Sequence, residues 1–299
     1  MTPPPADRYS IAHLRAGAAR ATRAVSRRLD GPGGWSAASS PTWLVPPDRP
    51  GVWCNVCGWA GPSFEGGEHS EAARCPVCGS IGRDRFLLHS LGARVPWRAG
   101  LRLLETSPRM GDAYRNAMSK WFDYQSSDYD ERAHRGAIRI DLQAIDLPDS
   151  SLDVILTAHV LEHVPDTDKA LGELQRVLVP GGWLVLQVPL LQPVTAPPTE
   201  PEFHGDDTPV FWRFGFDLTD RLRSHGYAVE LLCTDELRRI VAAGATRWPE
   251  AVSPEFDADA LLSAADPDQL TPIADTVTAA RLGFLPAYMY ATWACRAPL

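Results

Sequence analysis

The sequence has no apolar run close to the length of about 18 residues at which a segment becomes a candidate membrane-spanning helix. It also begins without the apolar core of about 7–15 residues that a secretory leader needs. We therefore expect no membrane span, no secretory signal and a cytoplasmic location. Hydrophobic residues make up 44% of the 299-residue chain, enough for one large domain and a small one.

Lysine is absent from the first 100 residues, which contain 12 Arg and 7 Asp or Glu. The whole chain has a formal net charge of −8, so its negative charge is concentrated after residue 100. Such a balance argues against broad affinity for nucleic acid. The basic N-terminal third could steer an anionic substrate, or it could simply be solvated, and the composition predicts no oligomeric state.

Cysteine is sparse outside two CxxC-G segments. The paired residues are Cys54, Cys57, Cys75 and Cys78, and the pairs are separated by 17 residues. Each CxxC turn brings two thiolates together, and the following glycine allows φ > 0 where the chain turns back. Four thiolates form a closed tetrahedral shell for Zn²⁺ with a structural role. An iron–sulfur centre and a redox dithiol are the alternatives. The remaining Cys233 and Cys295 are expected to be buried free thiols in neighbouring strands.

The segments that flank this zinc ribbon are predicted from local patterns. Residues 8–29 have helical spacing with many arginines, which favours a helix packed on its own domain over a membrane-surface or partner-binding helix. Residues 31–50 contain five prolines and form a linker or wrapping loop. Residues 80–91 are predicted to form a helix that joins the ribbon to the larger, C-terminal part of the chain. Its Arg83 and Arg85 could form local salt bridges or face a substrate cleft.

From Leu101 to Val188, short apolar runs alternate with helix-length amphipathic segments. This alternation is typical of a parallel sheet with helices on both faces. Acidic residues follow the ends of successive runs, and in an open α/β sheet the ligand binds at that edge. The sequence thus predicts an α/β fold with its site at the carboxyl ends of the strands.

Two motifs sharpen this prediction. His159 to Val164 read HVLEHV, and Leu178 to Gly182 read LVPGG. Together they resemble the class I S-adenosylmethionine (SAM)-dependent methyltransferases, over roughly residues 100–233 and a last strand at 288–296. The ribbon followed by a helix with the pattern R-x-R also resembles a bacterial group of zinc-ribbon methyltransferases. The resemblance implies a seven-stranded Rossmann-like sheet whose last strand lies antiparallel between the fifth and sixth, preceded by the ribbon.

The family's glycine-rich loop, E-x-G-x-G-x-G, is glycine-poor in this chain. Glu105 keeps the acid and Gly111 the last glycine, whereas Ser107 and Arg109 replace the first two. In the family, those glycines let the backbone come close to the methionine and ribose of SAM. Larger side chains at these positions leave less room for the cofactor beside the loop. Glu105 could accept a hydrogen bond from a ligand ammonium, order the loop, or cap the next helix.

The resemblance implies a cofactor site made of residues at successive strand ends. Asp128 would bind the ribose hydroxyls, Asp141 the adenine amine, and Leu142 would pack on the ring. At Asp128 the alternative is a surface carboxylate; at Asp141 and Leu142 it is a solvated acid beside a core leucine. The full expected cofactor set is Glu105, Thr106, Ser107, Gly111, Asp128, Asp141, Leu142, Thr157, Ala158 and His159.

The acceptor side of the site is predicted from histidines and aromatic residues. His159 should lie at the sulfonium edge, either as a wall that orients SAM or as a general base. His204, in a proline-rich segment that the family uses as a lid, is the second candidate base. Trp212 and Arg213 suit a flat or anionic acceptor, or pack beneath the lid.

The predicted domains are an N-terminal helix and linker (1–50), a zinc ribbon and connecting helix (51–92) and a methyltransferase domain (93–299) with a helical insertion at 234–285. The function favoured is methyl transfer from SAM to a small molecule, such as a sugar or secondary metabolite. One alternative is a SAM-dependent non-methylating enzyme, or a non-catalytic binding protein, on the same fold. The other is an RNA base methyltransferase. Residues 51–80 count against it because they contain one Arg, no Lys and three Glu.

Overall fold

The computed structural model describes residues 47–66, 73–130, 137–204, 207–244, 258–284 and 291–299. The N-terminal helix predicted at 8–29 and most of the predicted linker lie outside these residues. The first described elements are the short strands β1 (Val52–Trp53) and β2 (Ala60–Gly61), which pair antiparallel. Helix α2 (Gly82–Arg94) then leads into the main sheet.

The main sheet has eight strands in the order β11-β10-β12-β7-β6-β3-β4-β5. Its parallel part consists of β3 (Arg102–Thr106), β4 (Asp123–Asp128), β5 (Ile138–Arg139), β6 (Leu152–Ala158) and β7 (Leu178–Gln187). The remaining strands are β10 (Ala228–Thr234), β11 (Leu270–Ala274) and β12 (Thr292–Arg296). Strand β12 runs antiparallel between β7 and β10, as the sequence predicts.

The sheet departs from the predicted seven strands because the insertion is not entirely helical. Strand β11 comes from that insertion and pairs parallel with β10 at the edge of the sheet. The helical elements of the insertion are α6 (Asp235–Ala242), α7 (Ala258–Ala264), the 3-10 helix η5 (Pro267–Gln269) and α8 (Thr276–Leu282). The predicted insertion therefore extends the sheet as well as covering it.

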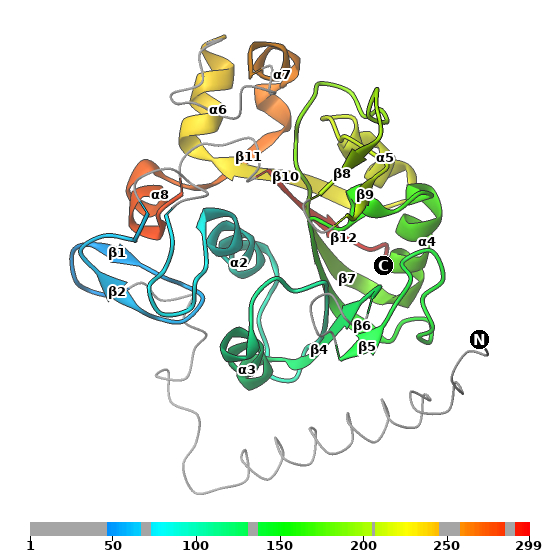
Figure 1. The fold of residues 1–299 in the computed structure, drawn as a ribbon, viewed down its shortest axis with the longest axis horizontal. Coiled ribbons are helices and arrows are strands. Elements are labelled where there is room, and N and C mark those ends of the chain that lie inside the picture. The colour runs from blue at the N-terminus through cyan, green and yellow to red at the C-terminus, as the bar shows by residue number, and fades with distance from the viewer. Residues whose placement is uncertain (1–46, 67–72, 131–136, 205–206, 245–257, 285–290) are drawn as a thin grey trace, which may run out of the picture.

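Helices cover both faces of the sheet (Figure 1). One face packs α2 and α3 (Asp112–Trp121); the other packs α4 (Thr167–Val177) and α5 (Leu218–Ser224). The period-2 alternation of strand side chains produces this arrangement. In β3, for example, Leu103 packs in the core that contains α2 and α3, whereas Leu104 packs in the core that contains α4 and α5.

Smaller elements lie at the carboxyl edge. The 3-10 helix η4 (Leu161–His163) follows β6, and a hairpin of β8 (Glu202–Phe203) and β9 (Pro209–Val210) lies beside it.

The Pro180-Gly181-Gly182 turn falls inside β7 instead of before it, and Gly181 has φ +71°. A Cβ at Gly182 would lie 2.9 Å from the Val179 carbonyl oxygen, so the bend requires glycine there. None of the helices in the described ranges has the length and apolar character needed to cross a bilayer.

Candidate metal centre and ligand cavity

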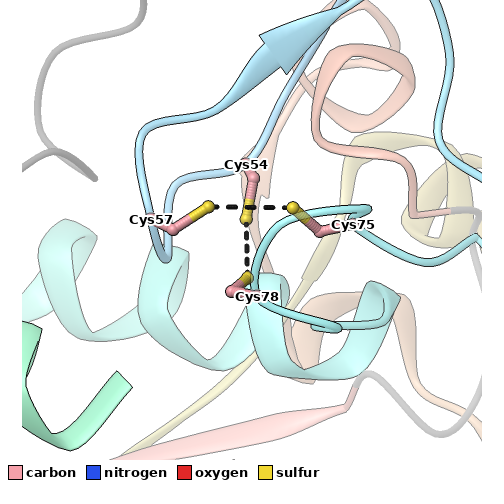
Figure 2. A group of neighbouring side chains, drawn as sticks. All are labelled: Cys54, Cys57, Cys75 and Cys78. Carbon is pink, nitrogen blue, oxygen red and sulfur yellow. Dashed lines mark hydrogen bonds between the residues drawn. The ribbon is translucent and has the colours of Figure 1, made fainter. Parts of the chain in front are cut away.

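The four paired cysteines converge on one point (Figure 2). Their sulfur atoms all lie within 4.8 Å of one another, with Cys54 Sγ 3.6 Å from Cys78 Sγ and Cys57 Sγ 3.7 Å from Cys75 Sγ. Four sulfurs placed about 2.3 Å from a tetrahedral Zn²⁺ lie about 3.8 Å apart. The donor set and its spacing therefore fit a zinc ion.

The chain around these cysteines is built to hold them. Gly58 and Gly79 follow the two pairs with φ of +78° and +73°, and their N–H groups donate to the carbonyls of Cys54 and Cys75. The Ser80 hydroxyl lies 3.2 Å from Cys54 Sγ and 3.3 Å from Cys78 Sγ, and such outer contacts fix the orientation of metal ligands. The predicted need for glycine after each pair is confirmed.

Arg83 and Arg85, whose roles the sequence left open, both lie on α2 but have different surroundings. Arg85 is fully buried, and its guanidinium donates to the carbonyls of Ser80, Ala73, Leu282 and Gly283. It also lies over the Phe64 ring, 3.8 Å from the ring centroid. Arg85 thus joins the ribbon to the end of α8. Arg83, by contrast, lines a cavity at the edge of the sheet.

That cavity has a volume of about 640 Å³ and lies where β3, β4, β5 and β6 end. The expected cofactor residues that line it are Thr106, Ser107, Asp128, Asp141, Leu142, Ala158 and His159. A smaller cavity of about 60 Å³ adjoins the loop after β3 and is lined by Glu105, Thr106, Ser107 and His159, among others. The strand ends thus bring most of the predicted set to one edge.

Two predicted cofactor residues lie elsewhere among the described residues. Gly111 is the N-cap of α3 and lines neither cavity, and no described atom would lie within 4 Å of a Cβ added there. The position therefore has no steric need for glycine. Thr157 is fully buried, and its hydroxyl accepts a 2.9 Å hydrogen bond from the Thr106 hydroxyl. It supports the cavity floor from below.

The glycine-poor loop keeps the conformation that glycine favours. Ser107 has φ +45°, which an L-residue adopts at a cost of about 1–2 kcal/mol. Its hydroxyl donates a 2.9 Å hydrogen bond to Asp128 Oδ1, which fixes that carboxylate at the cavity wall. Arg109 forms an ion pair with Asp84 and lines both cavities, and Met110 is buried beside the small one, so the large cavity stays open.

Glu105 is buried beneath the loop. Its two carboxylate oxygens accept hydrogen bonds from the hydroxyls of Tyr114, at 3.0 Å, and Tyr124, at 2.7 Å. Burial raises the pKa of Glu105 to about 7, although both hydrogen bonds act in the opposite direction. These hydrogen bonds link the end of β3 to α3 and β4.

His159 lies against a buried carboxylate. Its Nδ1 is 3.6 Å from Glu162 Oε1, and His163 Nε2 is 3.9 Å from the same oxygen. Burial by itself would raise the pKa of Glu162, but the nearby imidazoles of His159 and His163 lower it below its ordinary value. His159 has φ +57°, and its Nε2 is buried without a hydrogen-bond partner in the described parts of the chain. An imidazole held in this way keeps Nε2 available to a ligand.

The lid side of the cavity differs from the prediction in detail. His204 lines the cavity, and its ring lies 4.6 Å from the His163 ring, edge to face. Trp212 and Arg213 do not line it within the described structure. The Trp212 indole N–H donates to the Pro165 carbonyl, and Arg213 pairs with Glu202 of β8 at 2.8 Å, so both side chains are held by neighbouring elements outside the cavity wall.

Sequence reasoning missed several lining residues. Phe211, beside the predicted Trp212, faces the cavity, because its N–H donates to the Glu162 carbonyl and turns the chain there. The others are Ser127, Tyr129, Asp130, Ile140, Gln143, Val160, His163, Val164, Pro165, Thr208 and Pro209. Most of them lie at or just after the end of a strand or in and beside the HVLEHV motif, whereas Thr208 and Pro209 come from the β8–β9 hairpin and have no signal in the sequence.

Comparisons with known proteins give one family match over part of the chain and a set of similar solved structures. Residues 114–186 match the family described as methyltransferase domain. Among solved structures, a SAM-dependent methyltransferase from Mesorhizobium loti is 21% identical over 54% of this chain and 91% of its own, with a TM-score of 0.39. The YcgJ protein from Bacillus subtilis is 18% identical over 50% and 70%, also with a TM-score of 0.39. The [4+2]-cyclase SpnF is 14% identical over 79% and 86%, with a TM-score of 0.41. No curated protein matches the chain.

Proposed function

Because residues 114–186 match the methyltransferase domain family, we propose that the chain transfers a methyl group from SAM to a small-molecule acceptor, with a structural zinc ion in the ribbon. One observation carries the proposal: Asp128, Asp141 and Leu142 line a single cavity at the carboxyl ends of the parallel strands. In an open α/β sheet this edge is where ligands bind.

The residues around the cavity fit an adenosyl ligand. The Asp128 carboxylate offers acceptor oxygens to a pair of ribose hydroxyls, which are two donors. Asp141 accepts from the Gln143 backbone N–H at 2.8 Å, which orients the carboxylate for a second donor such as an exocyclic amine. Leu142 supplies an apolar wall for a ring. The volume of about 640 Å³ lies within the range of small-molecule sites, about 300–1,000 Å³.

Bound SAM would supply an electrophilic methyl group, which needs little covalent help from the protein. The residues of the chain then have to orient the acceptor, exclude water and take up a proton. His159 is the proposed base, because Glu162 beside Nδ1 leaves Nε2 as the proton-accepting nitrogen. His204, on the hairpin across the cavity, is the second candidate.

Calorimetric titration with SAM and S-adenosylhomocysteine tests the proposal. We expect the wild-type protein to bind both, and Asp128→Asn to weaken S-adenosylhomocysteine binding about 10-fold or more, because a neutral amide replaces two charged acceptors. Asp220→Asn on the surface of α5 is the matched control and should bind like the wild type. A wild-type protein that binds neither ligand would refute the proposal.

Product formation distinguishes the class of acceptor. Release of S-adenosylhomocysteine with sugars or other hydroxylated small molecules supports the proposed acceptor class. Turnover of ribosomal or transfer RNA, with strong salt-dependent retention on heparin, would replace it with an RNA methyltransferase. Tight ligand binding without transfer to any acceptor would indicate a non-methylating use of the same cavity.

A further inference from the structure

The smaller cavity has a part of its wall that it does not share with the larger one. This part includes Leu87 of α2, Glu105 of β3, Tyr114 of α3 and Gln187, the last residue of β7. None of these four residues lines the large cavity in the described structure. The walls that the two cavities share are formed by Arg83, Thr106, Ser107, Arg109, Ala158 and His159. A ligand can therefore extend from the large cavity into the small one beside these shared residues.

Gln187 directs its side chain to the face of the sheet on which the small cavity lies. In β7, Val185 packs in the core that contains α2 and α3, whereas Leu186 packs in the core on the other face. Side chains alternate along a strand, so Gln187 points to the same face as Val185. Its cross-strand partner, Thr292 of β12, accepts a 3.0 Å hydrogen bond from Gln187 Nε2. This bond fixes the side-chain amide on that face.

The side-chain oxygen of Gln187 is a buried acceptor. Gln187 is 1% exposed, and its Oε1 has no hydrogen-bond partner within the described ranges. A buried acceptor without a donor destabilises the fold, so its position at a cavity indicates that a bound molecule supplies the donor. The backbone of Gln187 is held as well, because its carbonyl accepts a 2.7 Å hydrogen bond from the N–H of His159. The same residue therefore adjoins both the small cavity and the proposed base.

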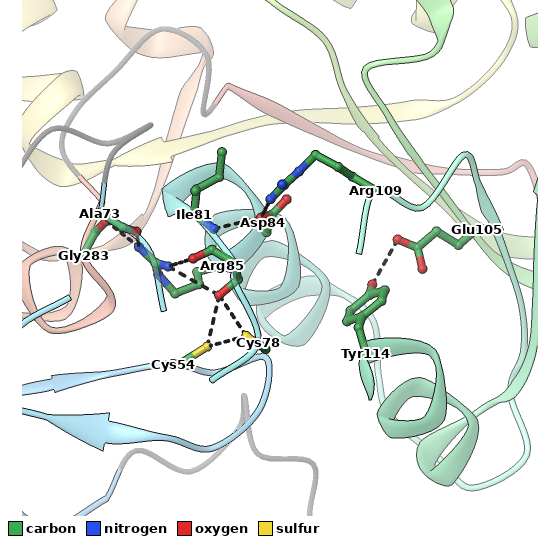
Figure 3. A network of polar contacts seen from close by, with 11 residues as sticks. Cys54, Ala73, Cys78, Ile81, Asp84, Arg85, Glu105, Arg109, Tyr114 and Gly283 are labelled. Carbon is green, nitrogen blue, oxygen red and sulfur yellow. Dashed lines mark hydrogen bonds and ion pairs between the residues drawn. The ribbon is translucent and has the colours of Figure 1, made fainter. Parts of the chain in front are cut away.

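The carboxylates and the imidazole at the small cavity already have partners or a role. Figure 3 shows the Glu105 carboxylate facing Tyr114, and each Glu105 oxygen accepts a hydrogen bond from a tyrosine hydroxyl. Asp84 is in an ion pair with an arginine of the loop after β3. His159 is the proposed base, and its Nε2 is assigned to the acceptor. Gln187 Oε1, by contrast, has neither a partner in the described structure nor a role in the proposed reaction.

We propose that Gln187 is a cofactor-binding residue whose Oε1 accepts a hydrogen bond from the ammonium group at the amino-acid end of SAM. The inference rests on the proposed function, in which Asp128 and Asp141 hold the adenosine in the large cavity. The amino-acid end has one ammonium and one carboxylate, and only the ammonium donates hydrogen bonds. An amide oxygen only accepts them, so the ammonium is the group that it can bind. A charged donor also makes this hydrogen bond stronger than a neutral one would.

Two analogues of S-adenosylhomocysteine separate the two groups at its amino-acid end. The aminopropyl thioether of adenosine keeps the ammonium and lacks the carboxylate, whereas the carboxypropyl thioether keeps the carboxylate and lacks the ammonium. Methionine is close to glutamine in length and has no amide. By calorimetry on the full chain, we expect Gln187→Met to weaken binding of S-adenosylhomocysteine and of the aminopropyl analogue about 10- to 100-fold. Binding of the carboxypropyl analogue should stay within about 2-fold of the wild type.

Gln125→Met is the matched control. Gln125 lies on β4, lines neither cavity in the described structure, and donates only a long 3.4 Å hydrogen bond to a backbone carbonyl. This variant should bind all three ligands like the wild type. The melting temperatures of Gln187→Met and Gln125→Met, together with binding of the carboxypropyl analogue, show whether the cavity is intact in each variant.

The contrary outcomes differ from one another. Equal loss with all three ligands would make Gln187 a structural residue and overturn the inference. Loss with S-adenosylhomocysteine and the carboxypropyl analogue, but not with the aminopropyl analogue, would mean that the amide presents its N–H to the ligand, which also overturns it. Unchanged binding of every ligand would mean that water, and not the cofactor, meets Oε1. All three results leave the proposed function standing, whereas a wild-type protein that binds neither SAM nor S-adenosylhomocysteine refutes the proposed function itself.

Discussion

Glu105 contributes to the fold, although the sequence also made it a candidate for the cofactor site. Its carboxylate oxygens accept hydrogen bonds from Tyr114 of α3 and Tyr124 of β4, so Glu105 ties β3 to the two elements that follow it in the chain. A buried carboxylate is stable only when it is hydrogen-bonded or neutral. Here it has two hydroxyl donors and a raised pKa of about 7, so it titrates close to neutral pH.

This titration predicts a pH dependence of stability. The folded-state pKa of about 7 lies above the ordinary value of 4.5, so the stabilisation is complete below pH 4.5 and is lost as pH rises to 7. The wild type should lose up to about 3 kcal/mol of unfolding free energy over this range through Glu105. In Glu105→Gln this loss should be absent. Urea unfolding of both proteins at pH 5 and pH 8 measures the difference.

The control for this experiment is Tyr124→Phe. It removes a hydrogen bond that lowers the pKa of Glu105, so the decline should extend to higher pH than in the wild type. Parallel stability curves for the wild type and Glu105→Gln would show that Glu105 has the same pKa in the folded and unfolded chain, contrary to the prediction.

The sequence predicted the residue types of the cavity better than their contacts. Asp128 and Asp141 were found because each lies at or just after the end of a strand. The positive φ of Ser107 could be suspected from the glycine that it replaces. Its hydrogen bond to Asp128, however, depends on the register between β3 and β4, which the sequence does not give. Of the aromatic cluster that begins at Phe211, only Phe211 lines the cavity in the described structure, because this segment has no helical or strand period that predicts side-chain direction.

At the scale of elements, strand β11 is the clearest failure of prediction. Its sequence, Leu-Thr-Pro-Ile-Ala, contains a proline, and Ala- and Asp-rich segments flank it. Proline lacks the N–H that a central strand needs, so the pattern counts against a strand. At the sheet edge, however, β11 has one neighbour, β10, and Pro272 is tolerated there.

The junction of α2, α8 and the ribbon depends on Arg85. The carbonyls that it binds include Leu282, the last residue of α8, and Gly283, its C-cap, where unpaired carbonyls and the helix dipole favour a cation. Arg85→Lys keeps the charge but loses the planar fork, which leaves buried carbonyls without donors. We expect it to lower the free energy of unfolding by about 3 kcal/mol or more.

Arg94→Lys is the comparison for that measurement, because it lies on the same helix in a partly exposed pair with Glu230. Such a pair contributes about 0–1 kcal/mol, so its replacement should change little. Denaturant unfolding, with limited proteolysis near α8, distinguishes the two variants. Similar small losses in both would mean that apolar packing, and not Arg85, holds the junction.

At the scale of the whole molecule, the ribbon and the sheet share a core. Cys54, Val56 and Phe64 belong to the same apolar cluster as Leu103 of β3 and Leu156 of β6. The predicted boundary near residue 92 falls inside α2, which packs against β7 and β12. A small ribbon buries too little apolar surface to fold on its own energy, so we infer that the metal and this shared core stabilise it together.

Metal removal should therefore weaken the whole chain and not only its first module. The protein as isolated should contain one zinc ion per chain by elemental analysis, without the visible absorption of an iron–sulfur centre. Chelation should lower the unfolding free energy by on the order of 5 kcal/mol, which corresponds to a decrease in Tm of about 10–20 °C. It should also weaken S-adenosylhomocysteine binding at temperatures where the sheet remains folded, because the start of α2, which contributes Arg83 to the cavity wall, loses its contact with the cluster through Ser80. Zinc added back should restore both quantities. A chelated protein with unchanged Tm and unchanged affinity would show that neither the fold nor the cavity depends on the four-cysteine cluster.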